Sequence, residues 1–131
     1  MSEKNDYNKL KAHLPQRGDR LERIENLAGS GTPDVNFCSN GTECWIEMKS
    51  PEEPKRETSQ LFGGRHKLSQ AQMNWFLRQR NAKGKAYVLI ITDKRMLLID
   101  GQHADDINAM TVNQLCEIAS WGATRPVRKA E

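Results

Sequence analysis

The sequence predicts one α/β domain: a helix, a three-stranded antiparallel meander, a second helix and a fourth strand, with an added C-terminal strand and helix. Three observations lead to this prediction. An Asn-Gly dipeptide at residues 40–41 separates two apolar segments, a combination typical of a β-hairpin. Ser69 and Gln72 have the spacing of a helix capping box. Residues 87–91 form an unbroken apolar run, as expected for a strand buried on both faces.

The N-terminal part contains the first helix and the meander. Tyr7–Leu14 is predicted to be a short helix that Pro15 stops. Arg20–Asn26 alternates in the manner of a strand, and Val35–Cys38 and Glu43–Lys49 are the two strands of the hairpin. The three strands follow one another closely, so an antiparallel meander is the expected arrangement.

A long loop separates the hairpin from the second helix. Residues 50–67 contain prolines, a Gly-Gly pair and charges of both signs without periodicity, so we expect a flexible basic loop. The second helix begins after Ser69 and is expected to end at Gly84.

The C-terminal part extends the sheet and ends in a helix. After the apolar strand, residues 95–100 form another predicted strand. Thr111 and Gln114 cap a last helix that reaches about Trp121, and residues 122–131 are expected to be a basic tail.

Length and composition limit the class of protein. A chain of 131 residues suits one domain, residues 1–131, with one modest core at about residues 7–92. No apolar run has membrane-spanning length and no signal-peptide core follows the first methionine, so we expect a cytoplasmic protein without a membrane partner. The three cysteines have no CxxC spacing, which argues against a disulfide framework and against a structural zinc site.

The positive charge is unevenly distributed. The net charge is only +3, but the basic side chains cluster, and locally basic surfaces suit a polyanion such as nucleic acid. Charge alone is equally compatible with an ordinary solvated surface. The clusters are Lys55, Arg56, Arg65, His66 and Lys67; Arg78, Arg80, Lys83 and Lys85; and Arg125, Arg128 and Lys129.

The hairpin brings acidic side chains together. A two-residue turn at residues 40–41 fixes the register, so that Val35 faces Ile46 and Asp34 directly opposes Glu47. Lys49 follows on the same face as Glu47, because strand side chains alternate. Directly opposed residues have Cβ atoms about 4.5–5.5 Å apart, and like charges at that distance destabilise a sheet.

A divalent cation would relieve this repulsion. Magnesium prefers oxygen ligands and keeps several waters, so two carboxylates, a main-chain carbonyl and waters form a plausible site. An ammonium beside such an ion lies where charge develops during attack on a phosphate. The hairpin is therefore interpreted as a metal site for phosphodiester hydrolysis; the alternative is a surface hairpin whose charges face water.

The same residues resemble a known group, the PD-(D/E)XK nuclease superfamily. The motif is Pro33-Asp34 followed by Glu47-Met48-Lys49, and the order of elements fits the restriction-endonuclease-like core of that superfamily. Within it, the likeness is strongest to virus-type replication-repair nuclease (VRR-NUC) domains and archaeal Holliday junction resolvases. The segments that carry this likeness are "GSGTPDV", "CWIEMKS" and "KLSQAQMNWF".

The resemblance implies roles for individual residues. Asp34, Glu47 and the main-chain carbonyl of Met48 would bind Mg²⁺ or Mn²⁺, and Lys49 would orient the attacking water or stabilise the transition state. Gln72 would order Lys49 or the substrate, besides capping its helix.

Further residues have positions that the resemblance connects with the site or with DNA. Arg23 and Ser30 lie where related resolvases carry an arginine and a serine near the active site. Relatives often carry a glutamate on the first helix; here that position has none, and Glu25 would be its substitute. Independently of the resemblance, the charge of the basic loop and its position directly after Lys49 predict DNA contacts from Lys55, Arg56, Arg65, His66 and Lys67.

The predicted function is a Mg²⁺- or Mn²⁺-dependent endonuclease that cuts DNA, including Holliday junctions or other branched DNA, in phage replication, recombination or repair. Resemblance to junction enzymes of this size implies a homodimer, because a small domain has one active site and a junction needs two cuts. A restriction-type or nicking nuclease of the same fold is one alternative. A nucleic-acid-binding module without catalysis is another, although such modules usually lack one of the three motif residues.

Overall fold

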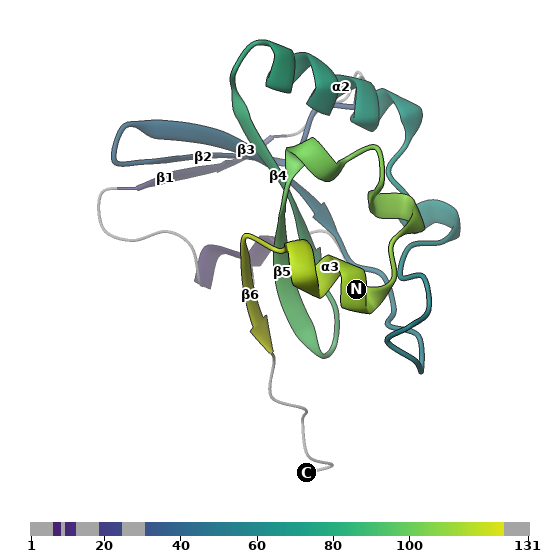
Figure 1. The fold of residues 1–131 in the computed structure, drawn as a ribbon. Helices are drawn as coiled ribbons and strands as arrows, with labels where there is room; N and C mark the ends of the chain where they lie inside the picture. The colour runs from purple at the N-terminus through teal and green to yellow at the C-terminus, as the bar shows by residue number, and fades with distance from the viewer. Residues whose placement is uncertain (1–6, 9, 13–18, 25–30, 125–131) are drawn as a thin grey trace.

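The computed structural model describes residues 7–8, 10–12, 19–24 and 31–124, which form a six-stranded sheet with helices on both faces (Figure 1). The side chains of Arg65, Ala123 and Thr124 are outside this description. Strands follow in sequence order across the sheet, with β3 and β4 parallel and all other neighbours antiparallel. The strands are β1 (Arg20–Arg23), β2 (Val35–Ser39), β3 (Thr42–Lys49), β4 (Lys85–Ile91), β5 (Arg95–Asp100) and β6 (Trp121–Thr124).

The helices form two layers around this sheet. Residues 7, 8 and 10–12 are helical. The other helices are α2 (Gln70–Asn81), α3 (Val112–Ile118) and the 3₁₀ turns η1 (Gly64–His66), η2 (Gly101–His103) and η3 (Ile107–Ala109). No helix among the described residues is long and apolar enough to cross a membrane.

Each face of the sheet has its own apolar core. On one face, Leu10 of the N-terminal helix packs with Val35, Ile46 and Met48 of the hairpin. On the other, α2 and α3 cover β4 and β5. Residues from β4 enter both cores, which confirms that this strand is buried on both faces.

The predicted hairpin register is confirmed. Val35 pairs with Ile46 and Phe37 with Cys44 around the two-residue turn. Asn40 and Gly41 have φ values of 52° and 79°, the left-handed conformations that favour Asn-Gly in such turns. Both predicted capping boxes, at Ser69 and at Thr111, are also present.

The ends of both long helices differ from the prediction. Helix α2 ends at Asn81, before Gly84, and Lys83 takes the left-handed conformation with φ of 66°. Gly84 is tightly packed, since a Cβ there would lie 2.3 Å from the side chain of Gln79. Helix α3 ends at Ile118, and the last strand, β6, then pairs with β5, so the expected basic tail begins inside a strand.

The segment from residue 50 to 67 packs against the C-terminal region, and its flexibility stays a prediction. Main-chain hydrogen bonds join it to the C-terminal region: Val112 N–H donates to Ser59 and Leu61 N–H donates to Met110. Leu61 and Phe62 are buried in the core below α2 and α3. These apolar side chains, which lie in a segment without periodicity, anchor it.

Candidate active site

The last residues of β3 carry the predicted catalytic motif. Side chains alternate along a strand, so Glu47 and Lys49 share one face while Met48 enters the core on the other. Glu47 is only 4% exposed, and Lys49 Nζ lies 3.8 Å from Glu47 Oε2. A buried carboxylate is costly unless it is paired, and the ammonium offsets part of that cost.

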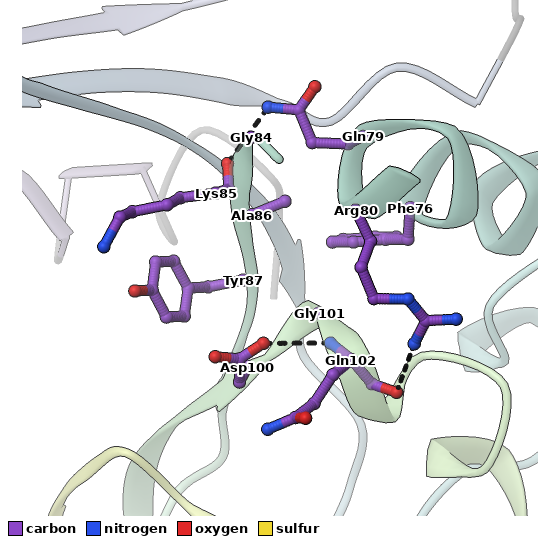
Figure 2. Close-up of a pocket in the computed structure, with 10 residues that line it drawn as sticks. All are labelled: Phe76, Gln79, Arg80, Gly84, Lys85, Ala86, Tyr87, Asp100, Gly101 and Gln102. Atoms are coloured by element: carbon purple, nitrogen blue, oxygen red, sulfur yellow. Dashed lines mark hydrogen bonds between the residues drawn. The ribbon is translucent and has the colours of Figure 1, made fainter. Parts of the chain in front are cut away.

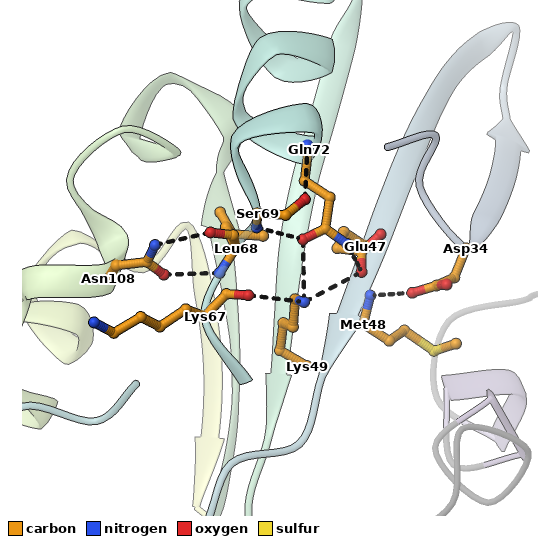
Figure 3. A network of polar contacts seen from close by, with 9 residues as sticks. All are labelled: Asp34, Glu47, Met48, Lys49, Lys67, Leu68, Ser69, Gln72 and Asn108. Carbon is orange, nitrogen blue, oxygen red and sulfur yellow. Dashed lines mark hydrogen bonds and ion pairs between the residues drawn. The ribbon is translucent and has the colours of Figure 1, made fainter. Parts of the chain in front are cut away.

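Gln72 connects both members of this pair (Figure 3). Its Nε2 donates to Glu47 Oε2 at 3.0 Å, and its Oε1 accepts a hydrogen bond from Lys49 Nζ at 3.2 Å. The same Oε1 accepts from the main-chain N–H of Ser69 at 2.9 Å, within the capping box that begins α2. The start of the helix is thereby tied to the charged end of β3.

Lys49 has a further acceptor on the opposite side. Its Nζ lies 3.4 Å from the main-chain carbonyl oxygen of Lys67, the residue that precedes the turn into α2. An ammonium has three donors, and here they face Glu47, Gln72 and this carbonyl. The lysine side chain is 12% exposed, so it is held in one direction at the edge of solvent.

Asp34 approaches β3 from the neighbouring strand. It lies in a bend just before β2, and its Oδ2 accepts a hydrogen bond from the Met48 main-chain N–H at 2.9 Å. The strand pairing ends with Val35 and Ile46, one pair before the expected opposition of Asp34 and Glu47, and the Asp34 side chain bonds the next residue of β3 instead. The physical reason is that the Asp34 side chain takes the donor that a longer ladder would have used.

Pro33 removes one possible donor to the main-chain oxygen of Met48. The N–H and C=O of one strand residue point towards the same neighbour, so the Met48 carbonyl points towards the β2 side, as its N–H does. Pro33 occupies the next position beyond Asp34, and proline has no N–H to donate to that carbonyl. The Met48 oxygen is therefore positioned near the Asp34 carboxylate.

These donors suit a hard divalent cation. The carboxylates of Asp34 and Glu47 and the carbonyl of Met48 are oxygen donors, and Mg²⁺ is commonly bound by one or two carboxylates with waters and substrate phosphates. In the part of the chain that the structure describes, no group of three or more His, Cys, Asp or Glu side chains gathers at one point. Oxygen donors of this kind are the ligands that hard divalent cations prefer, and the identity of the metal stays a prediction.

The fold is similar to that of a Holliday junction resolvase. The solved structure of Archaeoglobus fulgidus Hjc, a resolvase from an archaeal hyperthermophile, matches with a TM-score of 0.53 and 18% sequence identity, over 76% of this chain and 77% of that chain. No family model and no curated protein matches the sequence. The likeness confirms the predicted restriction-endonuclease-like α/β fold; the VRR-NUC likeness, the activity and the roles of the residues stay predictions.

Some predicted DNA-binding residues lie near this site. Lys67 is exposed, and Figure 3 shows its ammonium extending away from the carboxylates, towards solvent. Lys55 and Arg56 are exposed on the segment that follows β3, and His66 is half-buried in η1. Glu25, Ser30 and the side chain of Arg65 lie outside the described part of the chain.

Arg23 is placed differently from the other predicted residues. It pairs with Val35, and residues paired across a sheet share a face, so its side chain lies on the face opposite to Glu47. Its guanidinium carbon is 6.0 Å from the centre of the Tyr7 ring. This position favours a contact with the N-terminal helix, and its role in DNA binding stays a prediction.

A pocket at the other end of α2 is separate from this site (Figure 2). Arg80, near the end of the helix, donates to the Gln102 carbonyl at 3.1 Å across it, whereas Gln72 lies in the first turn. The lining residues are Phe76, Gln79, Arg80, Gly84, Lys85, Ala86, Tyr87, Asp100, Gly101 and Gln102.

One contributor to the polar network was not predicted. Asn108, in η3, hydrogen-bonds the main chain of Leu68, next to the carbonyl that accepts from Lys49. A single asparagine in a polar segment has no distinguishing sequence signal, and its contact depends on a turn far along the chain. Sequence spacing could therefore not have revealed it.

Proposed function

We propose that this protein is a metal-dependent endonuclease that hydrolyses DNA phosphodiester bonds, with branched DNA such as a Holliday junction as its substrate. One observation carries the proposal: Glu47, Lys49 and Gln72 form one network at the end of β3, next to Asp34, in a fold similar to that of a junction resolvase.

The oxygen donors would bind the metal ion. Asp34, Glu47 and the Met48 carbonyl are the residues that would hold Mg²⁺ or Mn²⁺. When bound, such an ion polarises a phosphate oxygen and stabilises the negative charge that develops during hydrolysis. The hydrogen bond from Met48 N–H fixes the Asp34 carboxylate in advance, which lowers the cost of organising the site.

Lys49 would act on the reacting groups. Its ammonium is held beside Glu47 at the edge of solvent, where a water or a phosphate oxygen can approach. There it would orient the attacking water and stabilise the extra negative charge on the phosphate. Gln72 would keep the ammonium in that position, since its side chain accepts a hydrogen bond from Lys49 and donates one to Glu47.

The surrounding basic residues would bind the DNA backbone. The exposed Lys67, Lys55 and Arg56 lie on the segment that leaves β3 and returns to α2, and we include His66 and Arg65 in the same surface. Contacts of this kind give affinity without sequence preference, as expected for an enzyme that recognises DNA shape. A homodimer would supply two such sites for the two cuts of a junction.

A cleavage assay tests this function. The purified protein is incubated with single-stranded, duplex, flap and four-way-junction DNA, with Mg²⁺, with Mn²⁺ and with a chelator, and Lys49→Ala is the matched variant with strongly reduced activity. We expect metal-dependent cuts, fastest in branched DNA. Equal cutting of linear duplex would favour a restriction-type or nicking nuclease, and tight binding without any cut would favour a non-catalytic module.

A further inference from the structure

Asn108 contacts both peptide groups of Leu68 on the side away from the charged site (Figure 3). Its Oδ1 accepts a hydrogen bond from Leu68 N–H at 2.8 Å, and its Nδ2 donates to the Leu68 carbonyl at 3.0 Å. Leu68 is 3% exposed, so these main-chain groups are in an environment where unpaired polar atoms are costly.

Each of these two peptide groups also has a second polar atom, and that atom points to the active site. Leu68 N–H and the Lys67 carbonyl belong to one peptide, and that carbonyl accepts from Lys49. The Leu68 carbonyl and Ser69 N–H belong to the next peptide, and that N–H donates to Gln72. Because a peptide group is planar, a hydrogen bond at one end fixes the direction of the group at the other end.

Asn108 is itself held by the fold. Its neighbour Ile107 is fully buried in the core that α2 and α3 cover. The side chain of Gln60 donates to the main-chain carbonyl of Asn108, and Leu61 N–H donates to the main-chain carbonyl of Met110. The asparagine therefore projects from a fixed turn.

We infer that Asn108 is a positioning residue for the catalytic lysine. By fixing the planes of two successive peptides, it aims the Lys67 carbonyl at Lys49 and the Ser69 N–H at Gln72. The ammonium is then held between its acceptors before substrate binds. This inference rests on the proposed nuclease function, and it gives the C-terminal region, which lies outside the Asp-Glu-Lys motif, a part in the site.

Two substitutions separate the two hydrogen bonds. Asn108→Ala removes both, whereas Asn108→Asp keeps an acceptor for Leu68 N–H and loses the donor to the Leu68 carbonyl. Asn113→Ala is the matched control, since Asn113 is exposed on α3 and its main-chain bond to Glu57 does not need its side chain. Thermal unfolding of each variant confirms that the domain is folded before the rates are compared.

The first measurement is single-turnover cleavage at saturating junction DNA, together with DNA affinity. Small misplacements of a catalytic group cost up to about 100-fold in rate. We expect Asn108→Ala to reduce the cleavage rate by about 10- to 100-fold with DNA affinity nearly unchanged, and Asn108→Asp, whose carboxylate faces the Leu68 carbonyl oxygen, to reduce it at least as much. Asn113→Ala should match the wild type in both measurements.

The second measurement does not depend on activity. Hydrogen exchange at the Ser69 amide reports the bond to Gln72, and it should become faster in Asn108→Ala but not in Asn113→Ala. A double-mutant cycle with Lys49→Ala completes the test: if Asn108 acts through the lysine, its removal costs far less in that background.

The outcomes distinguish a failure of the proposed nuclease function from a failure of the role inferred for Asn108. A wild-type protein that cuts no DNA would contradict the proposed function. A wild-type protein that cuts DNA, with Asn108→Ala equally fast and Ser69 exchange unchanged, would contradict this inference alone. Strictly additive effects of Asn108→Ala and Lys49→Ala would also overturn it.

Discussion

The carboxylate of Asp34 accepts a hydrogen bond from the main-chain N–H of Met48, with 2.9 Å between oxygen and nitrogen. This bond replaces the strand pairing that would otherwise continue beyond Val35 and Ile46. The side chain is thereby fixed at the end of β3, where Glu47 and Lys49 also lie. A carboxylate that terminates a strand ladder in this way is placed by a main-chain donor.

The first prediction concerns the charge of Asp34. Asp34→Asn keeps an oxygen that can accept from Met48 N–H, so we expect a thermal midpoint close to that of the wild type but no cleavage and greatly reduced metal affinity. Asp34→Ala loses the hydrogen bond as well, which we expect to cost about 1–3 kcal/mol of unfolding free energy. Titration calorimetry with Mn²⁺ and urea unfolding measure both effects. Full activity of the asparagine variant would exclude Asp34 as a ligand.

Glu47→Gln is the companion variant. It removes the negative charge that Lys49 Nζ faces at 3.8 Å, while the amide keeps an oxygen towards Gln72. We expect lost cleavage in a folded protein, again checked by calorimetry and unfolding. Cleavage at the wild-type rate would show that the buried carboxylate is structural.

The hairpin, both capping boxes and the buried strand could be predicted because their signals are local. Asn-Gly at residues 40–41 determines the register, and that register places Glu47 and Lys49 on one face. The bend at Asp34 could not be predicted, because the Asp34 carboxylate accepts the Met48 N–H that the strand ladder would otherwise use. The contact of Asn108 with Leu68 joins residues 40 positions apart, and no periodicity encodes such a contact.

The second prediction separates the two functions of Gln72. Gln72→Ala and Gln114→Ala each remove the side chain of a capping box, one at α2 and one at α3. We expect Gln114→Ala to lose only its capping bond, and Gln72→Ala to lose more stability, because it also removes a hydrogen-bond partner of the buried Glu47. Only Gln72→Ala should reduce cleavage strongly, since only Gln72 contacts Lys49 and Glu47. Chemical unfolding and single-turnover rates give the comparison, and equal rates in the two variants would contradict it.

The third prediction concerns Lys49. Lys49→Ala should reduce turnover by orders of magnitude while metal still binds, because the ammonium acts mainly on charge that develops in the transition state. Lys85→Ala is a matched control, since Lys85 is an exposed lysine at the opposite end of the β3–β4 pair. Turnover and calorimetry are measured on both variants. Lost metal affinity with unchanged turnover would reverse the assignment.

The fourth prediction concerns the reactivity of the cysteines. Burial raises the pKa of the Cys44 thiol to about 11, and the nearby Lys85 charge offsets only part of this shift. The thiolate is the reactive form, so at neutral pH Cys44 stays protonated and unreactive. Cys38, which is partly exposed, should be alkylated by iodoacetamide before Cys44. Peptide mass spectrometry over time measures the order, and rapid labelling of Cys44 in the folded protein would contradict it.

The last prediction concerns the basic segment between β3 and α2. Main-chain hydrogen bonds join it to the C-terminal region and its Leu61 and Phe62 are buried, so its exposed basic side chains are the part that would contact DNA. Lys67 is exposed at the end of this segment, and its main-chain carbonyl accepts the hydrogen bond from Lys49. Each phosphate contact that is lost should reduce the salt dependence of binding by about one unit of slope.

Lys67→Ala should therefore weaken DNA binding across many sequences and flatten that slope by about one unit, and Arg65→Ala in the same chain should add to the effect. The Lys67 carbonyl belongs to the main chain, so the bond to Lys49 persists and single-turnover cleavage at saturating DNA should fall much less than affinity does. Titration of both variants at several salt concentrations measures this. An unchanged slope and affinity in the double variant would mean that this surface does not touch the substrate.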